Sequence, residues 1–171
     1  MGLAVLVFNS HGAAYQALHL IGLEPALECL ELIPMGSQAQ LLIKGAPEKL
    51  RAFLPQLSVA DVESITFVEK WNQKIERAFY SLEHSKLRES LIFIENKSLG
   101  PLFLAAEAGI ERGYEIVDLK IPRGSVRWGI LILTGDSEAS ESLQDLRVKG
   151  NQVTQIQSPS GLLRKYFDIE V

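Results

Sequence analysis

Side chains that could take part in acid–base, nucleophilic or metal chemistry are few and scattered. The chain has a single cysteine, Cys29, and three histidines, His11, His19 and His84. Their spacing forms no metal-ligand pattern, and one cysteine cannot form an internal disulfide. Cys29 lies in an alternating, strand-like stretch, which favours a small buried hydrophobic residue over a nucleophile. We therefore expect no metal and no cofactor.

Other polar residues are equally weak candidates for catalysis. Glu95 and Lys97 flank an expected turn, where ion pairing at a subunit contact is the simpler interpretation. His11 precedes the first expected helix and suits a capping or solvated role better than that of a switch or ligand. The chain lacks a Gly-x-Ser-x-Gly elbow, a phosphate loop and a dinucleotide fingerprint; Gly109 and Gly113 indicate tight helix packing or a helix end. We expect no enzymatic activity.

Composition narrows the class of protein further. The 171 residues are 47% hydrophobic and 22% charged, a balance typical of a folded chain. The net charge is −4 without a basic run, which argues against a nucleic-acid partner. The apolar start has no basic leader and is broken by Asn9-Ser10-His11, far short of a membrane span or a secretory signal. We expect a cytoplasmic protein without a membrane partner.

The elements that must position any site are repeated within the chain. The segment Gly22–Leu32 resembles Gly109–Leu119 at an offset of 87 residues. After one inserted residue, Ile33-Pro34-Met35-Gly36-Ser37 falls on Ile121-Pro122-Arg123-Gly124-Ser125, and Leu41–Gly45 falls on Leu131–Gly135. Upstream, Val7-Phe8-Asn9 covers Ile94-Glu95-Asn96. A shared Ile-Pro-x-Gly-Ser at one place in both copies indicates duplication rather than chance similarity of apolar strands.

Each copy has the same expected order of elements. The predicted strands are 3–8, 27–33 and 39–43 in the first copy and 91–95, 115–121 and 128–133 in the second. The predicted helices are 13–23 and 47–53 in the first copy and 101–112 and 137–146 in the second. The fold class is therefore α/β, a tandem duplication of a small β-α-β-β-α sandwich related to ferredoxin-like folds.

Two further segments complete the expected organisation. A connector contains a strand at 63–68 and a helix at 69–83, with Trp71, Ile75, Ala78 and Phe79 on one helix face. Residues 148–156 are expected to form a last strand, and Leu162–Phe167 to dock on a neighbour or fray. The predicted boundaries are residues 1–56 for the first repeat, 57–89 for the connector, 90–147 for the second repeat and 148–171 for a C-terminal extension.

These residues carry a family resemblance. The second copy runs from Leu91–Lys97 through Ala105-Ala106-Glu107-Ala108 and Val117-Asp118-Leu119 to Arg123-Gly124-Ser125 and Ile130–Asp136. In this order its motifs resemble the domain of bacterial microcompartment shell proteins. The first copy is a more degraded match that keeps Gly36-Ser37 and the apolar skeleton. The two copies cover roughly two thirds of the chain, so the resemblance is to tandem-domain members of that family.

The resemblance implies a homotrimer of pseudo-sixfold shape with a central pore, in contact with other shell proteins or encapsulated enzymes. The loop before each third strand would line the pore: Met35, Gly36, Ser37 and Gln38 in the first copy, and Arg123, Gly124, Ser125 and Val126 in the second. Glycine suits backbones that approach an axis closely. A plain turn between two strands is the alternative for both loops.

The resemblance also implies an edge at which neighbouring oligomers meet, and at this edge the sequence differs from that of family members. Where family members carry a lysine that contacts its counterpart in the neighbouring oligomer, this chain has Glu24 and Glu111, with Arg112 adjacent to the second. Facing carboxylates repel, so we expect a closed oligomer rather than a flat lattice. The sequence thus favours a non-enzymatic shell protein, and leaves open a small-molecule-binding or regulatory α/β oligomer that builds no compartment.

Overall fold

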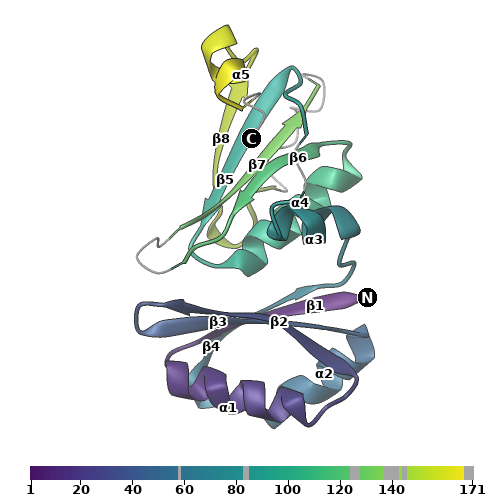
Figure 1. The fold of residues 1–171 in the computed structure, drawn as a ribbon, viewed down its shortest axis with the longest axis vertical. Coiled ribbons are helices and arrows are strands. Elements are labelled where there is room, and N and C mark those ends of the chain that lie inside the picture. Colours follow the sequence, from purple (N-terminus) through teal and green to yellow (C-terminus); the bar gives the residue numbers. More distant parts are fainter. Residues whose placement is uncertain (58, 83–84, 124–127, 137–142, 144–145, 168–171) are drawn as a thin grey trace. The chain divides into compact units, whose positions relative to one another are not determined.

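The chain folds into two compact units. The computed structural model describes residues 1–57, 59–82, 85–123, 128–136, 143 and 146–167 (Figure 1). The first unit comprises Met1–Trp71 together with Ser98–Gly100 and Pro122–Arg127. The second comprises Asn72–Lys97, Pro101–Ile121 and Trp128–Val171.

The first unit is one antiparallel sheet with helices on one face. Its elements are β1 (Gly2–Phe8), α1 (His11–Gly22), β2 (Leu27–Met35), β3 (Gln38–Gly45), α2 (Pro47–Phe53), the 3₁₀ turns η1 (Leu54–Gln56) and η2 (Val59–Asp61), and β4 (Val62–Val68). The strand order is β2-β3-β1-β4. β1 and β3 are therefore central, and this explains why every residue of β1 is buried.

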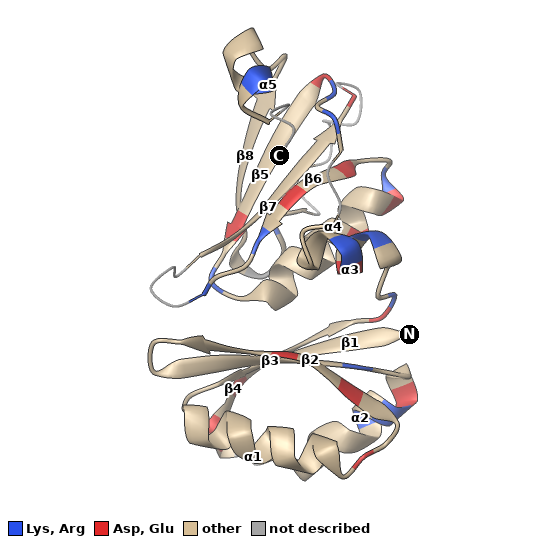
Figure 2. Cartoon of the chain, viewed as in Figure 1, with Lys and Arg blue, Asp and Glu red and all other residues tan. Residues whose placement is uncertain are grey.

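Local sequence explains where α1 begins and which face of it packs on the sheet. The Ser10 hydroxyl accepts a hydrogen bond from the Ala13 N–H at 3.2 Å, capping the first turn. Ala14, Ala17 and Ile21 share one face and are buried against the sheet. α1 carries no Asp, Glu, Lys or Arg, as Figure 2 shows. The core beneath α1 and α2 consists mainly of Ala4, Leu6, Phe8, Ala39, Leu41, Ile43, Leu50 and Phe53.

The second unit repeats this arrangement. Its elements are α3 (Gln73–Phe79), β5 (Ser90–Asn96), α4 (Leu99–Glu111), whose first two residues group with the first unit, β6 (Glu115–Lys120), β7 (Gly129–Gly135), the 3₁₀ turn η4 (Val148–Gly150), β8 (Gln152–Gln157) and α5 (Gly161–Phe167). Its strand order is β6-β7-β5-β8, and all pairs are antiparallel.

Glycines allow α4 to lie close to its sheet and to end there. A Cβ at Gly109 would lie 2.6 Å from Leu133 Cδ1, so only a hydrogen fits at that position without a shift. Gly113 has φ +83°, and the Tyr114 N–H donates to the Gly109 carbonyl at 3.0 Å, a helix end that favours glycine. Both interpretations of this glycine pair from the sequence are therefore confirmed.

The helix of the connector is shorter than predicted. The sequence favours a helix over 69–83, whereas α3 begins at Gln73 because the Asn72 side chain accepts from the Lys74 N–H and caps it. Trp71 therefore lies before the helix, and its backbone N–H donates to the Met1 carbonyl at 2.9 Å. The predicted face of Ile75, Ala78 and Phe79 is buried, with the Phe79 ring 6.0 Å from that of Phe103.

The hydrogen-bond register shows the duplication more exactly than the sequence did. In β2, Cys29 and Glu31 pair with consecutive residues of β3, which leaves Leu30 as a bulge; Val117 is the equivalent bulge in β6. In the first strands, Gly2 pairs with Gly45 as Ser90 pairs with Gly135.

This register corrects the alignment of the first strands. Gly2 matches Ser90, an offset of 88 residues, whereas the sequence alignment of Val7-Phe8-Asn9 used 87 and was wrong by one residue. The match of Ile33 to Ile121 was also wrong by one residue. Ile33 pairs with Gln40 as Lys120 pairs with Ile130, so Ile33 corresponds to Lys120. A one-residue slip exchanges the two faces of a strand.

A fourth strand extends each sheet beyond the predicted β-α-β-β-α unit. β4, which was expected in the connector, pairs with β1, and β8 pairs with β5. The predicted helix at 137–146 falls almost entirely outside the described residues. Within the described part of the chain, none of the helices is long and apolar enough to cross a membrane.

Candidate functional site

The turn between β2 and β3 is the candidate site in the first repeat. Met35 and Gln38 form the last pair of the hairpin, so Gly36 and Ser37 are its two turn residues. Gly36 has φ +63°, whereas Ser37 is not among the residues with positive φ. Glycine with positive φ at the first turn position is typical of a type II′ hairpin. Gly36 and Ser37 are exposed, and Met35 and Gln38 are half-buried.

Polar side chains behind the tip hold this turn. Gln40 is 1% exposed; its amide nitrogen donates to the Met35 sulfur, and its Oε1 accepts from the Leu99 N–H at 2.9 Å. The Gln38 side chain donates to the Glu63 carboxylate of β4. One side chain of β3 and one of β4 thus hold the last pair of the hairpin, and the tip residues Gly36 and Ser37 are exposed.

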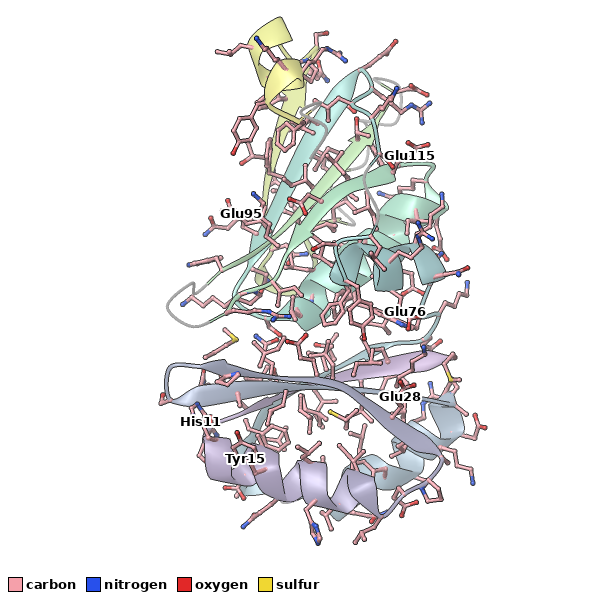
Figure 3. All side chains as sticks on the ribbon, in the orientation of Figure 1. His11, Tyr15, Glu28, Glu76, Glu95 and Glu115 are labelled. Carbon is pink, nitrogen blue, oxygen red and sulfur yellow. The ribbon has the colours of Figure 1, made fainter. Side chains whose placement is uncertain are left out.

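His11 contributes to the same turn from α1. Its Nε2 lies 3.0 Å from the Gln38 carbonyl oxygen, so the hydrogen is on Nε2. In Figure 3, His11 lies at the start of α1, beside the end of the hairpin, and Tyr15 lies one turn further along the helix. The histidine is exposed and links the first turn of α1 to β3.

The second repeat has a longer connection at the equivalent place. The pairs Lys120–Ile130 and Asn96–Gly129 are the last of β6–β7 and β5–β7, so eight residues, 121–128, join the strands. Arg123 Nη2 lies 2.7 Å from Glu31 Oε1, a residue of β2 in the same unit. The remaining predicted loop residues, Gly124, Ser125 and Val126, lie outside the described residues.

The predicted edge residues lie near the C-terminal ends of α1 and α4. Glu24 is half-buried in the turn after α1, where its N–H donates to the Ile21 carbonyl at 2.9 Å. Glu111 is the last residue of α4, and the Arg112 N–H donates to the Gly109 carbonyl at 3.1 Å. Glu111 and Arg112 thus lie at the end of α4, and the role of all three residues in assembly stays a prediction.

The other candidates from the sequence make packing or charge contacts that do not form a reactive site. Cys29 is half-buried on β2; burial, then the charges of Glu31 and Glu28, raise the pKa of its thiol, which disfavours the nucleophilic thiolate. The Lys97 ammonium lies 5.6 Å from the centre of the Trp128 ring, a cation–π contact. Among the residues that the structure describes, no group of three or more His, Cys, Asp or Glu side chains could hold a metal ion.

Sequence reasoning missed the residues behind the first turn. Gln40 is a buried amide next to the apolar run Leu41-Leu42-Ile43 of β3, and Glu63 comes from β4, which pairs with the far side of β1. A glutamine directly before a buried apolar run is a usable signal, because a buried amide needs hydrogen-bond partners. Glu63 carries no such signal in its local sequence.

The comparisons with known proteins bear on the fold. No family model and no curated protein sequence matches the chain. A solved structure described as a microcompartments protein from Desulfitobacterium hafniense DCB superposes with a TM-score of 0.77 at 20% identity, covering 96% of this chain and 98% of that one.

Two other solved structures are much less similar. One is a proposed glycine cleavage system transcriptional repressor, with a TM-score of 0.33 at 12% identity, covering 91% of this chain and 96% of that one. The other is an unknown protein from Galdieria sulphuraria, with a TM-score of 0.30 at 14% identity, covering 91% and 97%. Only the first likeness shows a shared fold, and it confirms the tandem α/β architecture expected from the resemblance to microcompartment proteins.

Proposed function

We propose that this chain is a non-enzymatic shell-type protein of a bacterial microcompartment, which assembles as a homotrimer of pseudo-sixfold shape around a central pore. The observation that carries the proposal is the duplicated four-stranded unit, with equivalent strand order and an equivalent bulge, in a fold shared with a microcompartments protein. Three chains of two repeats supply six similar units to one ring.

The turn between β2 and β3 supports a place at the axis of such a ring. Its tip, Gly36-Ser37, is exposed and has no bulky side chain, so several copies can approach closely. Gln40, Gln38 and His11 hold the turn from behind, which favours a fixed rim over a flexible one. A rim of defined shape is what selective passage of small molecules requires.

The charge of the described rim residues favours uncharged polar metabolites. Arg123 would make the hole electropositive if its guanidinium faced the axis alone, but Glu31 lies 2.7 Å from it and offsets the charge. Gly36 and Ser37 add only backbone groups and a hydroxyl. The proposed location is the cytoplasm, within a compartment assembled with other shell proteins and around encapsulated enzymes.

Native mass spectrometry and cross-linking test the trimer. We expect a mass of three chains. In a Cys29→Ser background, a short bismaleimide should link Ser37→Cys between copies, because the tips gather at the axis. Glu48→Cys is the matched control: it is exposed and follows the opposite end of β3, about 25 Å away by strand rise, and should not link. A monomeric mass, or equal linking of both variants, would reject the proposal.

A further inference from the structure

The C-terminal helix α5 covers the second face of the β6-β7-β5-β8 sheet without being buried itself. Leu163 and Phe167 pack against the cluster of Leu91, Val117 and Ile132, and the Phe167 ring lies 6.3 Å from that of Phe93. No residue of α5 is buried. A seven-residue helix is not stable alone, so α5 depends on its contacts with the rest of the unit.

The side of α5 next to this contact is also apolar, and the Tyr166 ring lies 5.2 Å from that of Phe167. Leu162 is 82% exposed and Tyr166 is 66% exposed, whereas Leu163 and Phe167 face the sheet. The apolar stripe of α5 is therefore wider than the part that faces the sheet. The chain's own sheet covers only Leu163 and Phe167, so the exposed part favours contact with a further surface.

The link between β8 and α5 is strained in its present conformation. Ser158 has φ +49°, a left-handed conformation that costs a non-glycine residue about 1–2 kcal/mol. It also precedes Pro159, which favours an extended backbone at the preceding residue. Both preferences would be met if Ser158 became extended, and α5 would then leave its own sheet.

Specific hydrogen bonds hold the closed form. The Ser158 N–H donates to the Glu89 carbonyl at 2.8 Å. The Arg164 guanidinium donates to the carbonyls of Leu87 at 3.3 Å and Arg88 at 2.9 Å. All of these acceptors lie on the segment leading into β5, so a second copy of the chain presents the same set in the same geometry.

We propose that α5 is exchanged between two copies of this chain, each helix covering the partner's β6-β7-β5-β8 sheet with its Leu163 and Phe167. Exchange keeps every contact of the closed form, relieves the left-handed Ser158, and brings the exposed Leu162 and Tyr166 beside the second copy. A second copy is the favoured occupant because it alone carries the identical apolar face and the carbonyls that Arg164 binds. The exchange does not depend on the proposed trimer.

Isotope-coded cross-linking tests the exchange. In a Cys29→Ser background, Phe93→Cys with Phe167→Cys is prepared as ¹⁴N and ¹⁵N protein, and the two are unfolded, refolded together and linked with a short bismaleimide. We expect linked peptides that combine ¹⁴N with ¹⁵N, approaching half of all links at full exchange. Links of a single isotope only would overturn the proposal. Leu87→Cys with Leu163→Cys repeats the test without removing the two rings.

Variants at the hinge separate exchange from nonspecific association. Ser158→Gly accepts the left-handed conformation, and should lower the equilibrium constant for exchange by about tenfold. The fraction of mixed links should fall accordingly. Ser158→Val is worse than serine at positive φ and should raise it. Because both variants change the same position, they control for each other. Equal mixed fractions in Gly, Ser and Val would show that hinge strain does not drive the exchange.

Discussion

At the scale of single residues, the buried polar groups are the least predictable part of the molecule. Thr134 is fully buried; its hydroxyl donates to the Ser90 carbonyl and accepts from the Arg88 N–H, both at 2.8 Å. Asn151 connects residues far apart in sequence: it accepts from the Asn96 amide at 2.8 Å and donates to the carbonyls of Leu146 and Pro101. Local sequence marks such residues as turn or strand positions, and gives no indication of their partners.

Replacing Asn151 tests how much its hydrogen bonds contribute to the stability of the fold. We expect Asn151→Ala to lower the free energy of unfolding by about 2–3 kcal/mol, because it leaves a buried amide and two carbonyls without their partner. Urea unfolding measures the change. Gln152→Ala, the next residue along and exposed, is the control and should stay within about 0.5 kcal/mol. Equal effects of the two changes would show that the amide cluster adds nothing.

At the scale of elements, the sequence predicted strands and helices well wherever periodicity was strong. Helix α2 matches its predicted bounds, Pro47–Phe53, and the central strands β1 and β3 differ by only one or two residues at their ends. The errors have local causes: Asn72 caps α3 later than the apolar pattern suggested, and an apolar strand such as β1 matches its copy almost as well when it is shifted by one residue. The correct match of β1 to β5 therefore came from the hydrogen-bond register.

Close packing between elements also gives a testable position. A Cβ at Gly135, the end of β7, would lie 2.5 Å from Cδ1 of Tyr114, whose ring is buried. We expect Gly135→Ala to destabilise the fold by about 1–3 kcal/mol, measured as a lower urea midpoint at unchanged slope.

The control is a glycine with free space around it. Gly12 lies in α1, and a Cβ at this position would have nothing within 4 Å beyond its own helix and neighbours. Gly12→Ala should therefore be neutral or stabilising by up to about 1 kcal/mol. If Gly135→Ala behaved like Gly12→Ala, the ring of Tyr114 would have to move freely, in contrast to its burial.

At the scale of the whole molecule, the sequence predicted the α/β class and the duplication, and the structure added the fourth strand to each sheet. The fourth strands were assigned to a connector and a tail because they follow the repeated motif in sequence and share no obvious motif of their own. For the candidate site, the sequence located the turn at Gly36-Ser37. It could not supply Glu63, because the contact of Glu63 with Gln38 depends on strand order. Gln40 was missed, although a buried glutamine beside an apolar run is a usable signal.

Assembly beyond one ring is the prediction at this scale. We expect discrete rings in negative-stain electron microscopy, because the carboxylates of Glu24 and Glu111 would face their counterparts at a flat edge. Changing both, Glu24→Lys with Glu111→Lys, should promote extended sheets. The matched change of charge elsewhere, Glu48→Lys with Glu115→Lys, should not. Sheets formed by the unchanged protein would contradict the expected role of these two residues.

The equivalent bulges at Leu30 and Val117 bear on the order in which the bulge and the duplication arose. An extra residue at the same register of two sheets is explained most simply by one insertion in a single ancestral unit, copied when the gene was doubled. The bulge is then older than the duplication, whereas the different connections after β2 and β6 arose later. The two copies have therefore diverged in these connections, whereas the bulged framework of the sheets was inherited.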